Sequence, residues 1–159
     1  MFIDFGTSLD LHGRPEGSKS SGYPGPFTYK YGAPEVHKWQ QRSRLSDVFS
    51  LGCVYIEILA QLEPALVPKG ISVLREPYYQ HIADFQRQLQ GIEPKDPHLK
   101  PVFAACIEMI RSAKESRIKA VDLVHKLASA SNAESDATVL LCQGCITDLR
   151  HGMTDEVMA

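Results

Sequence analysis

The clearest pattern in the chain is a segment near its middle that is apolar on nearly every side. Residues 47–60, DVFSLGCVYIEILA, lack the polar face of a surface helix, and a helix that is hydrophobic all round is normally buried on all sides. Ser46 and Asp47 supply side-chain oxygens that can cap its first turn. We therefore expect this segment to be the central helix of the fold, with other helices around it.

Three later segments have the hydrophobic spacing of helices with one buried face. Gly91 and Pro94 end the first of them. A short helix is expected just after Pro34, because the residue before a proline is rarely helical. The inward positions predicted in the three helices are Ile82, Phe85 and Leu89; Leu99, Val102, Phe103, Cys106, Ile107 and Ile110; and Ala120, Leu123, Val124 and Leu127.

The two ends of the chain follow different patterns. Residues 1–6 read as the end of a strand, and residues 13–26, rich in Gly, Pro and Ser, predict a surface loop. From about Ser129 the helical pattern weakens, so residues 129–137 look like a linker or a frayed helix end. Residues 138–149, TVLLCQGCITDL, fit either a strand or a helix. The expected fold class is mainly α, with a little strand at its start.

Composition narrows the class of protein. The 159 residues are 43% hydrophobic and 23% charged, which suits one soluble globular domain. A net charge of −2 provides no strong basic field for nucleic acid or an anionic membrane. We find no run long enough to span a bilayer and no secretory signal pattern. We therefore expect an intracellular protein, cytoplasmic or nuclear, with neither nucleic acid nor membrane as a partner.

The four cysteines give little support for a metal site. Cys53 and Cys106 lie inside apolar helical patterns, where cysteine is usually a small buried hydrophobe. Cys142 and Cys145 form a Cys-x-x-Cys pair, but a zinc site needs about four ligands and neither a second pair nor a suitably spaced His pair accompanies it. Chance spacing is favoured over metal or redox use.

Four short motifs occur in order along the chain. They are Asp4-Phe5-Gly6, then Thr28-x-x-Tyr31 leading into Ala33-Pro34-Glu35, then SDVFSLGCVYIEIL from Ser46, and finally Arg117 within ESRIKAVDLVHKL. Their order and spacings, with the all-apolar segment, resemble the C-terminal lobe of eukaryotic protein kinases of the Ser/Thr type. The resemblance covers residues 1–128, as an activation segment at 4–35 and a helical core at 36–128. It leaves residues 129–159 as a tail of uncertain structure.

The resemblance implies roles at the start of the chain. Asp4 would coordinate the Mg²⁺ ions that bridge the phosphates of ATP, because a hard cation prefers carboxylate oxygen. Phe5 would pack inward, and Gly6 would permit the backbone turn that follows. The alternative is a strand that meets an ordinary turn.

It also implies roles further along the chain. Thr28 and Tyr31 would form part of the shelf that holds a peptide substrate, although Phe27 stands where the family usually has Gly. Glu35 and Arg117 would meet as a buried ion pair that holds the activation segment to the helical core, rather than remain separate surface charges. Asp47 would accept backbone N–H bonds from the catalytic loop, or simply cap its own helix.

Other parts that phosphoryl transfer requires are absent from this sequence. It contains no Gly-x-Gly-x-x-Gly loop and no His-Arg-Asp loop, and no strand Lys can be assigned to hold ATP. The intact parent would transfer the γ-phosphate of ATP to protein Ser or Thr, whereas we expect this chain alone to be inactive and to bind neither Mg²⁺ nor ATP tightly. Whether it counts as an enzyme therefore stays open.

Two other readings remain. A non-catalytic interaction module would bind a protein substrate, a docking protein or another kinase, and an unrelated helical adaptor would make the motifs a coincidence. On the kinase reading, segments that normally cover residues 47–60 are missing. We therefore expect that Phe49, Val54, Ile56 and Leu59 are not all buried, and that the isolated chain associates or aggregates.

Overall fold

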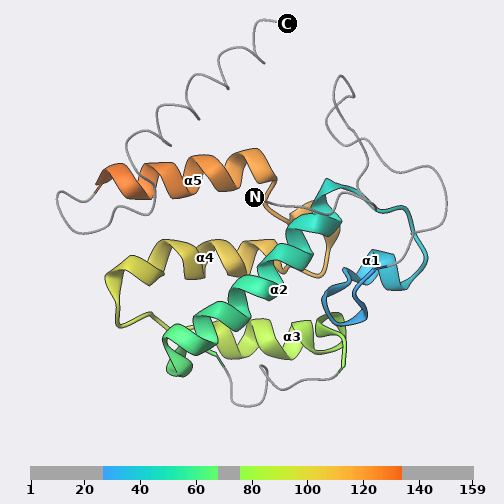
Figure 1. The fold of residues 1–159 in the computed structure, drawn as a ribbon, viewed down its shortest axis with the longest axis horizontal. Coiled ribbons are helices and arrows are strands. Elements are labelled where there is room, and N and C mark those ends of the chain that lie inside the picture. Colours follow the sequence, from blue (N-terminus) through green and yellow to red (C-terminus); the bar gives the residue numbers. More distant parts are fainter. Residues whose placement is uncertain (1–26, 68–75, 134–159) are drawn as a thin grey trace, which may run out of the picture.

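The computed structural model describes residues 27–67 and 76–133, and these form a layered group of helices (Figure 1). Within these two ranges the regular structure is helical and contains no strand, so the mainly α expectation is confirmed for them. The strand expected at residues 1–6 lies outside the described residues. The helices are α1 (Pro34–His37), α2 (Arg44–Leu62), α3 (Tyr78–Leu89), α4 (Lys100–Met109) and α5 (Ala120–Ala133), with single 3₁₀ turns η1 (Tyr29–Tyr31), η2 (Pro64–Leu66), η4 (Pro97–Leu99) and η5 (Lys114–Ser116).

Helix α2 crosses in front of α3 and α4 in Figure 1 and forms the main contacts of the core. Its N-cap is Ser43, in extended conformation, so neither Ser46 nor Asp47 is the N-cap residue, but Ser46 takes part in the cap as the third residue of a capping box. The chain enters the helix one turn earlier than the apolar pattern suggests, because Ser46 Oγ accepts a hydrogen bond from the Ser43 N–H (3.1 Å). This bond satisfies a backbone donor just before the helix begins.

The larger core cluster lies between α2, α3 and α4. Gly52 of α2 permits a close approach to α4, since a Cβ atom built on it would lie 2.8 Å from Met109 Cβ. The inward positions predicted for α3 are all buried, whereas Leu99, Val102 and Ile107 are only partly buried. The buried members on the three helices are Phe49, Cys53, Ile56 and Leu59; Tyr78, Ile82, Phe85 and Leu89; and Phe103 and Cys106, with Ile110 following α4.

Helix α5 packs on α4 and α2 through a second cluster. Its buried members are Val48, Ala105, Met109 and Leu123, and Tyr55, Ile118 and Leu127 pack against them. The prediction that Ala120 faces inward is wrong, because this residue is exposed at the very start of α5, ahead of the turn that reaches the cluster. The helix continues to Ala133, a few residues beyond the point at which the sequence pattern weakens.

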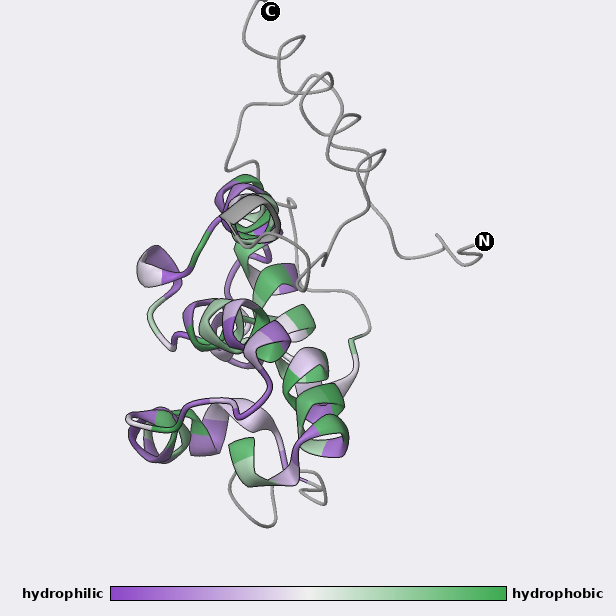
Figure 2. Ribbon diagram, turned by 90° about the vertical axis from the view of Figure 1, so that its left-hand side faces the viewer, coloured by the Kyte–Doolittle hydropathy of each residue, from purple (hydrophilic) through white to green (hydrophobic). Residues whose placement is uncertain are grey.

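One face of α2 is not covered by the described part of the chain. Leu51, Val54, Ile58 and Leu62, named here the α2 stripe, are 43%, 39%, 46% and 63% exposed. Figure 2 shows this strongly hydrophobic helix at one side of the described ribbon. The expectation that the helix is buried on all sides is therefore wrong, because a uniformly apolar sequence does not specify which neighbour covers each face.

Judged by length and composition alone, α2 is long enough and apolar enough to cross a membrane. This corrects the expectation that no run is long enough. Central helices of soluble proteins meet the same criteria, and here Phe49, Ile56 and Leu59 are buried among α3 and α4 while Val54 is exposed.

Trp39 lies just beyond the short helix that was expected after Pro34, and it does not pack into the core. Helix α1 ends at His37, and Trp39 follows it with a φ of 56° and 66% of its surface exposed. The Trp39 N–H donates to Val36 O (3.1 Å) and the Gln40 N–H donates to Glu35 O (2.9 Å). These bonds close the turn, which directs the Trp39 side chain outward.

Candidate functional site

Glu35 is placed by a one-turn helix that the local sequence favours. Ala33 is extended (ψ 154°) and Pro34 occupies the first turn of α1, where its missing N–H leaves no helical bond unmade. Only 6% of Glu35 is exposed. A carboxylate buried to this degree requires a partner.

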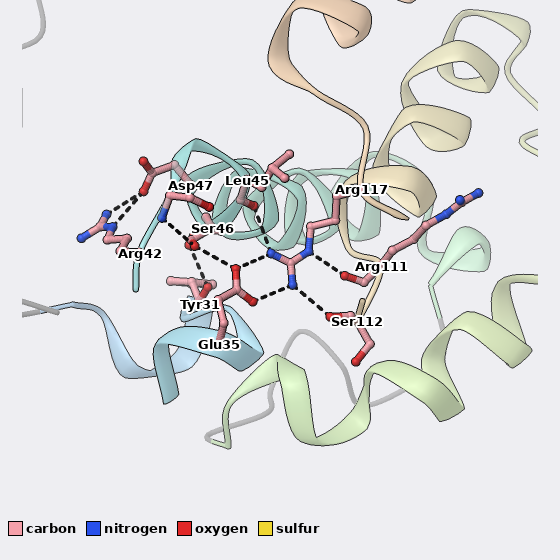
Figure 3. Close-up of polar contacts among 11 residues, drawn as sticks. Tyr31, Glu35, Arg42, Leu45, Ser46, Asp47, Arg111, Ser112 and Arg117 are labelled. Atoms are coloured by element: carbon pink, nitrogen blue, oxygen red, sulfur yellow. Dashed lines mark hydrogen bonds and ion pairs between the residues drawn. The ribbon is translucent and has the colours of Figure 1, made fainter. Parts of the chain in front are cut away.

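That partner is Arg117, which lies 82 positions away in the sequence. Arg117 Nη1 and Nη2 donate to Glu35 Oε1 (2.6 Å) and Oε2 (2.8 Å). Figure 3 shows the guanidinium and the carboxylate facing each other edge to edge beside the start of α2. This two-pronged geometry is the stronger form of an Arg–carboxylate contact. It joins α1 to the loop that precedes α5.

The remaining hydrogen-bond donors of Arg117 are also satisfied. Its Nη1 donates to Leu45 O (3.1 Å), Nη2 to Ser112 O (3.1 Å) and Nε to Arg111 O (2.7 Å). Its guanidinium carbon lies 4.9 Å from the centre of the Phe49 ring, a contact that favours a cation. All five N–H groups of a fully buried guanidinium therefore have acceptors.

The environment of Glu35 favours its charged form. Burial by itself raises the pKa of this carboxyl, but the hydrogen bonds from Arg117, the backbone and Ser46, together with the charge of Arg117, lower it below its ordinary value. Ser46 Oγ donates to Glu35 Oε1 (2.8 Å). The first turn of α2 therefore takes part in the same network, an involvement that sequence reasoning did not predict.

A second polar cluster, which sequence reasoning missed, surrounds Glu57 of α2. Lys30 Nζ lies 2.6 Å from its Oε1, Tyr78 Oη donates to Oε1 (2.9 Å), and Tyr31 Oη donates to Oε2 (3.0 Å). Burial raises the pKa of Glu57, and these three partners reverse the effect, so that the net shift is downward. A usable signal was present, because Glu57 is the single charged residue between positions 48 and 62.

The Glu57 cluster ties the segment before α1 to the core. The rings of Tyr31 and Tyr78 stack with centroids 6.0 Å apart, and Ser50 Oγ donates to Tyr31 O (2.9 Å). Residues 28–35 are thus held at two points, at Tyr31 through Glu57 and at Glu35 through Arg117. Such an arrangement can fix the position of a segment that would otherwise be a surface loop.

The other predicted site residues lie in different surroundings. Thr28 is exposed and lines, together with Tyr31, an open groove of about 370 Å³ between residues 27–36 and the outer side of α2. Asp47 is largely exposed, and its Oδ1 accepts bonds from Arg42 Nε (3.1 Å) and Nη2 (2.7 Å) (Figure 3). Asp4, Phe5 and Gly6 lie outside the described residues.

No described cluster offers a metal site. Within residues 27–67 and 76–133, there is no group of three or more His, Cys, Asp or Glu side chains placed to hold a metal ion. Cys53 and Cys106 are free thiols buried in the core, as their apolar surroundings predicted. Burial raises the pKa of both, to about 12 for Cys106, so these thiols are poor ligands and nucleophiles. Cys142 and Cys145 lie outside the described residues.

Comparison with known proteins gives one relevant similarity. The chain is 32% identical over 105 residues to the dual specificity protein kinase zak2 of Dictyostelium discoideum. The matched stretch covers 64% of this chain and 16% of that protein. No protein-family model matches the chain, and no solved structure matches it significantly. The similarity points to a relationship with protein kinases.

Proposed function

We propose that this chain is part of a protein kinase domain of the Ser/Thr type and supplies most of its helical C-terminal lobe. The intact protein would transfer the γ-phosphate of ATP to Ser or Thr hydroxyls of a protein substrate inside the cell. The order of the four motifs supports this proposal, and so does the 32% identity to a protein kinase of which this chain spans a small part.

The observation that carries the proposal is the buried Glu35–Arg117 pair. It joins two motifs 82 positions apart with both side chains nearly excluded from water. An ion pair buried this deeply is costly to form, and loss of either partner would leave an unpaired buried charge. Here it anchors residues 28–35, the segment to which we assign contact with the peptide substrate through Thr28 and Tyr31.

The chain by itself would not catalyse the reaction. Phosphoryl transfer depends on positioning ATP and on neutralising developing negative charge, and the sequence lacks the glycine loop and the His-Arg-Asp loop for those tasks. In a longer protein that holds both, Asp4 would bind the Mg²⁺ that accompanies ATP. Its carboxylate is the ligand type that this ion prefers.

The decisive experiment starts from the full transcript that encodes this chain. We expect it to encode, in frame and upstream, a glycine loop and a His-Arg-Asp loop. The longer protein should phosphorylate casein, and Asp4→Ala should abolish this transfer, whereas Asp10→Ala, a nearby matched control, should not. The isolated 159-residue chain should transfer no more phosphate than its own Asp4→Ala variant. Activity that survives Asp4→Ala in the longer protein would contradict the assigned role.

A second candidate is a non-catalytic, kinase-like interaction module. The observation that favours it is the open groove beside α2, whose lining includes Phe27, Leu51 and Val54 next to polar Thr28 and Ser50. Mixed apolar and polar lining of this kind suits a peptide segment of another protein. The same transcript discriminates between the two candidates, because a complete reading frame without the glycine loop and the His-Arg-Asp loop would favour the module.

A further inference from the structure

His37, the last residue of α1, lies among three aromatic rings. Its imidazole meets the rings of Phe27 and Tyr29 edge to face, with centroids 5.1 Å and 4.9 Å apart, a geometry in which aromatic rings attract each other. Its centroid also lies 4.3 Å from that of Tyr79 in α3. These four residues, named here the His37 cluster, join residues 27–29 to α1 and α3.

The imidazole of His37 also holds the backbone of Tyr29. Its Nε2 lies 3.0 Å from Tyr29 O, and because a carbonyl oxygen only accepts, Nε2 carries the proton in this hydrogen bond. Burial lowers the pKa of His37 below its ordinary value, although the bond to Tyr29 O opposes the shift. At neutral pH the ring therefore donates this bond as the uncharged Nε2–H tautomer.

Gly32 provides the space for this arrangement. Its φ of −61° and ψ of 136° are open to any residue, so packing rather than backbone conformation requires glycine here. A Cβ atom built on Gly32 would lie 2.7 Å from Phe27 Cε2 and 2.8 Å from His37 Nε2. The Phe27 ring thus occupies the place where a side chain at position 32 would lie. This explains how the chain accommodates a large ring where the family that it resembles usually has Gly.

The His37 cluster holds the segment that we assign to peptide binding at a point of its own. Thr28 is exposed and lies between the two residues whose rings meet His37 edge to face. The anchors at Tyr31 and Glu35 both lie on the C-terminal side of Thr28. Those two alone would leave Thr28 able to pivot about Tyr31, whereas packing and hydrogen bonds on both sides of a residue fix its position.

We propose that His37 is a positioning residue, which fixes Thr28 so that residues 28–35 present a preformed surface to a peptide substrate. It acts through the two residues that flank Thr28 rather than by direct contact with the peptide. A preformed surface loses less conformational freedom on binding, so the effect is on the affinity for the peptide. The cluster is a feature of the described residues, whereas its role in peptide binding rests on the proposed function.

Amide hydrogen exchange of the 159-residue chain tests whether His37 holds this segment. In His37→Gln the side-chain amide can donate where Nε2 does, whereas His37→Leu fills similar space without a donor. Exchange in residues 27–33, followed by mass spectrometry, should be several-fold faster in His37→Leu than in the wild type and intermediate in His37→Gln. Exchange in α4 should be unchanged in both variants. Lys38→Ala, at a neighbouring exposed position, is the matched control and should exchange like the wild type.

Three results of the exchange experiment would overturn the proposal. His37→Leu could exchange like the wild type, which would mean that the imidazole holds nothing. His37→Gln and His37→Leu could be equally fast, which would exclude the hydrogen bond to Tyr29 O. Faster exchange that extends to α4 in both variants would show a general loss of structure rather than a local hold on residues 27–33.

Steady-state kinetics of the longer protein tests the role in substrate binding. His37→Leu should raise the KM for casein several-fold and leave the KM for ATP unchanged, and His37→Gln should recover part of the loss. A purely structural role would instead reduce the amount of folded enzyme, which lowers the apparent kcat and leaves both KM values as they are; that pattern would overturn the proposal. If the longer protein transferred no phosphate to casein, the proposed function and this role would both fail, whereas hydrogen exchange would still show whether His37 holds residues 27–33.

Discussion

The Glu35–Arg117 pair gives the sharpest prediction for stability. Three variants of the full chain form a cycle: Glu35→Gln, Arg117→Met and the double variant. Glu35→Gln removes the negative charge while it keeps the shape of the side chain. Arg117→Met removes the positive charge and leaves an apolar chain that can still pack against Phe49, which the guanidinium contacts at 4.9 Å.

The magnitude follows from the burial of the two partners. The side chain of Arg117 is fully buried and that of Glu35 is 7% exposed, so either single change leaves an ionised group with neither a counter-charge nor water. Loss of one partner of such a pair costs about 3–5 kcal/mol. That is a large part of the 5–15 kcal/mol by which a domain is typically stable, so the single variants should be close to unfolding.

The double variant should be less destabilised than the sum of the two single variants, because it leaves no unpaired charge. Residues in direct contact typically couple by about 0.5–3 kcal/mol, and we expect the upper part of that range here. The measurement is urea unfolding followed by far-UV circular dichroism, with the free energy extrapolated to water. Arg42→Ala is the control, since its pair with Asp47 is exposed and should contribute at most about 1 kcal/mol.

Two results would refute this reasoning. If each single variant lost less free energy of unfolding than the Arg42→Ala control, the pair would not be the main anchor of residues 28–35. If the effects of Glu35→Gln and Arg117→Met were simply additive, the two side chains would not depend on each other, contrary to the 2.6 Å and 2.8 Å contacts between them.

Three further outcomes are expected. The pKa of Glu35 is lowered in the folded protein, so its charge contributes stability above the ordinary Glu pKa of about 4.3. That contribution is lost as the pH falls through the lower pKa of the folded state. Between these pH values, the free energy of unfolding should therefore fall less steeply with decreasing pH for Glu35→Gln than for the wild type. Gly52→Ala should destabilise the chain by about 1–3 kcal/mol, since its Cβ would lie 2.8 Å from Met109 Cβ, and thermal melting measures this. Tyr31→Phe removes the 3.0 Å hydrogen bond to Glu57 and should lower the free energy of unfolding by about 1 kcal/mol. Tyr29→Phe is the control, because the Tyr29 ring is exposed. Equal losses in the two variants would contradict the role of the Glu57 cluster.

The amino-acid sequence by itself determined where the main helices form and much of which face they bury. The spacing of Ile82, Phe85 and Leu89 is a local property of the chain, and all three are buried in α3, because a helix repeats every 3.6 residues whatever surrounds it. Glu35 and Arg117 could be chosen from the sequence only through the resemblance to a family, since no local pattern relates positions 82 apart.

Only the tertiary structure decided which neighbours each side chain meets. It brought Glu57 to Lys30 and two tyrosines, placed Trp39 in the solvent, and left the α2 stripe open although the sequence of α2 is apolar all round. The physical reason is that hydrophobicity favours removal of a surface from water without specifying what covers it. The partner of a buried charge or of an apolar face is set by the path of the chain in three dimensions.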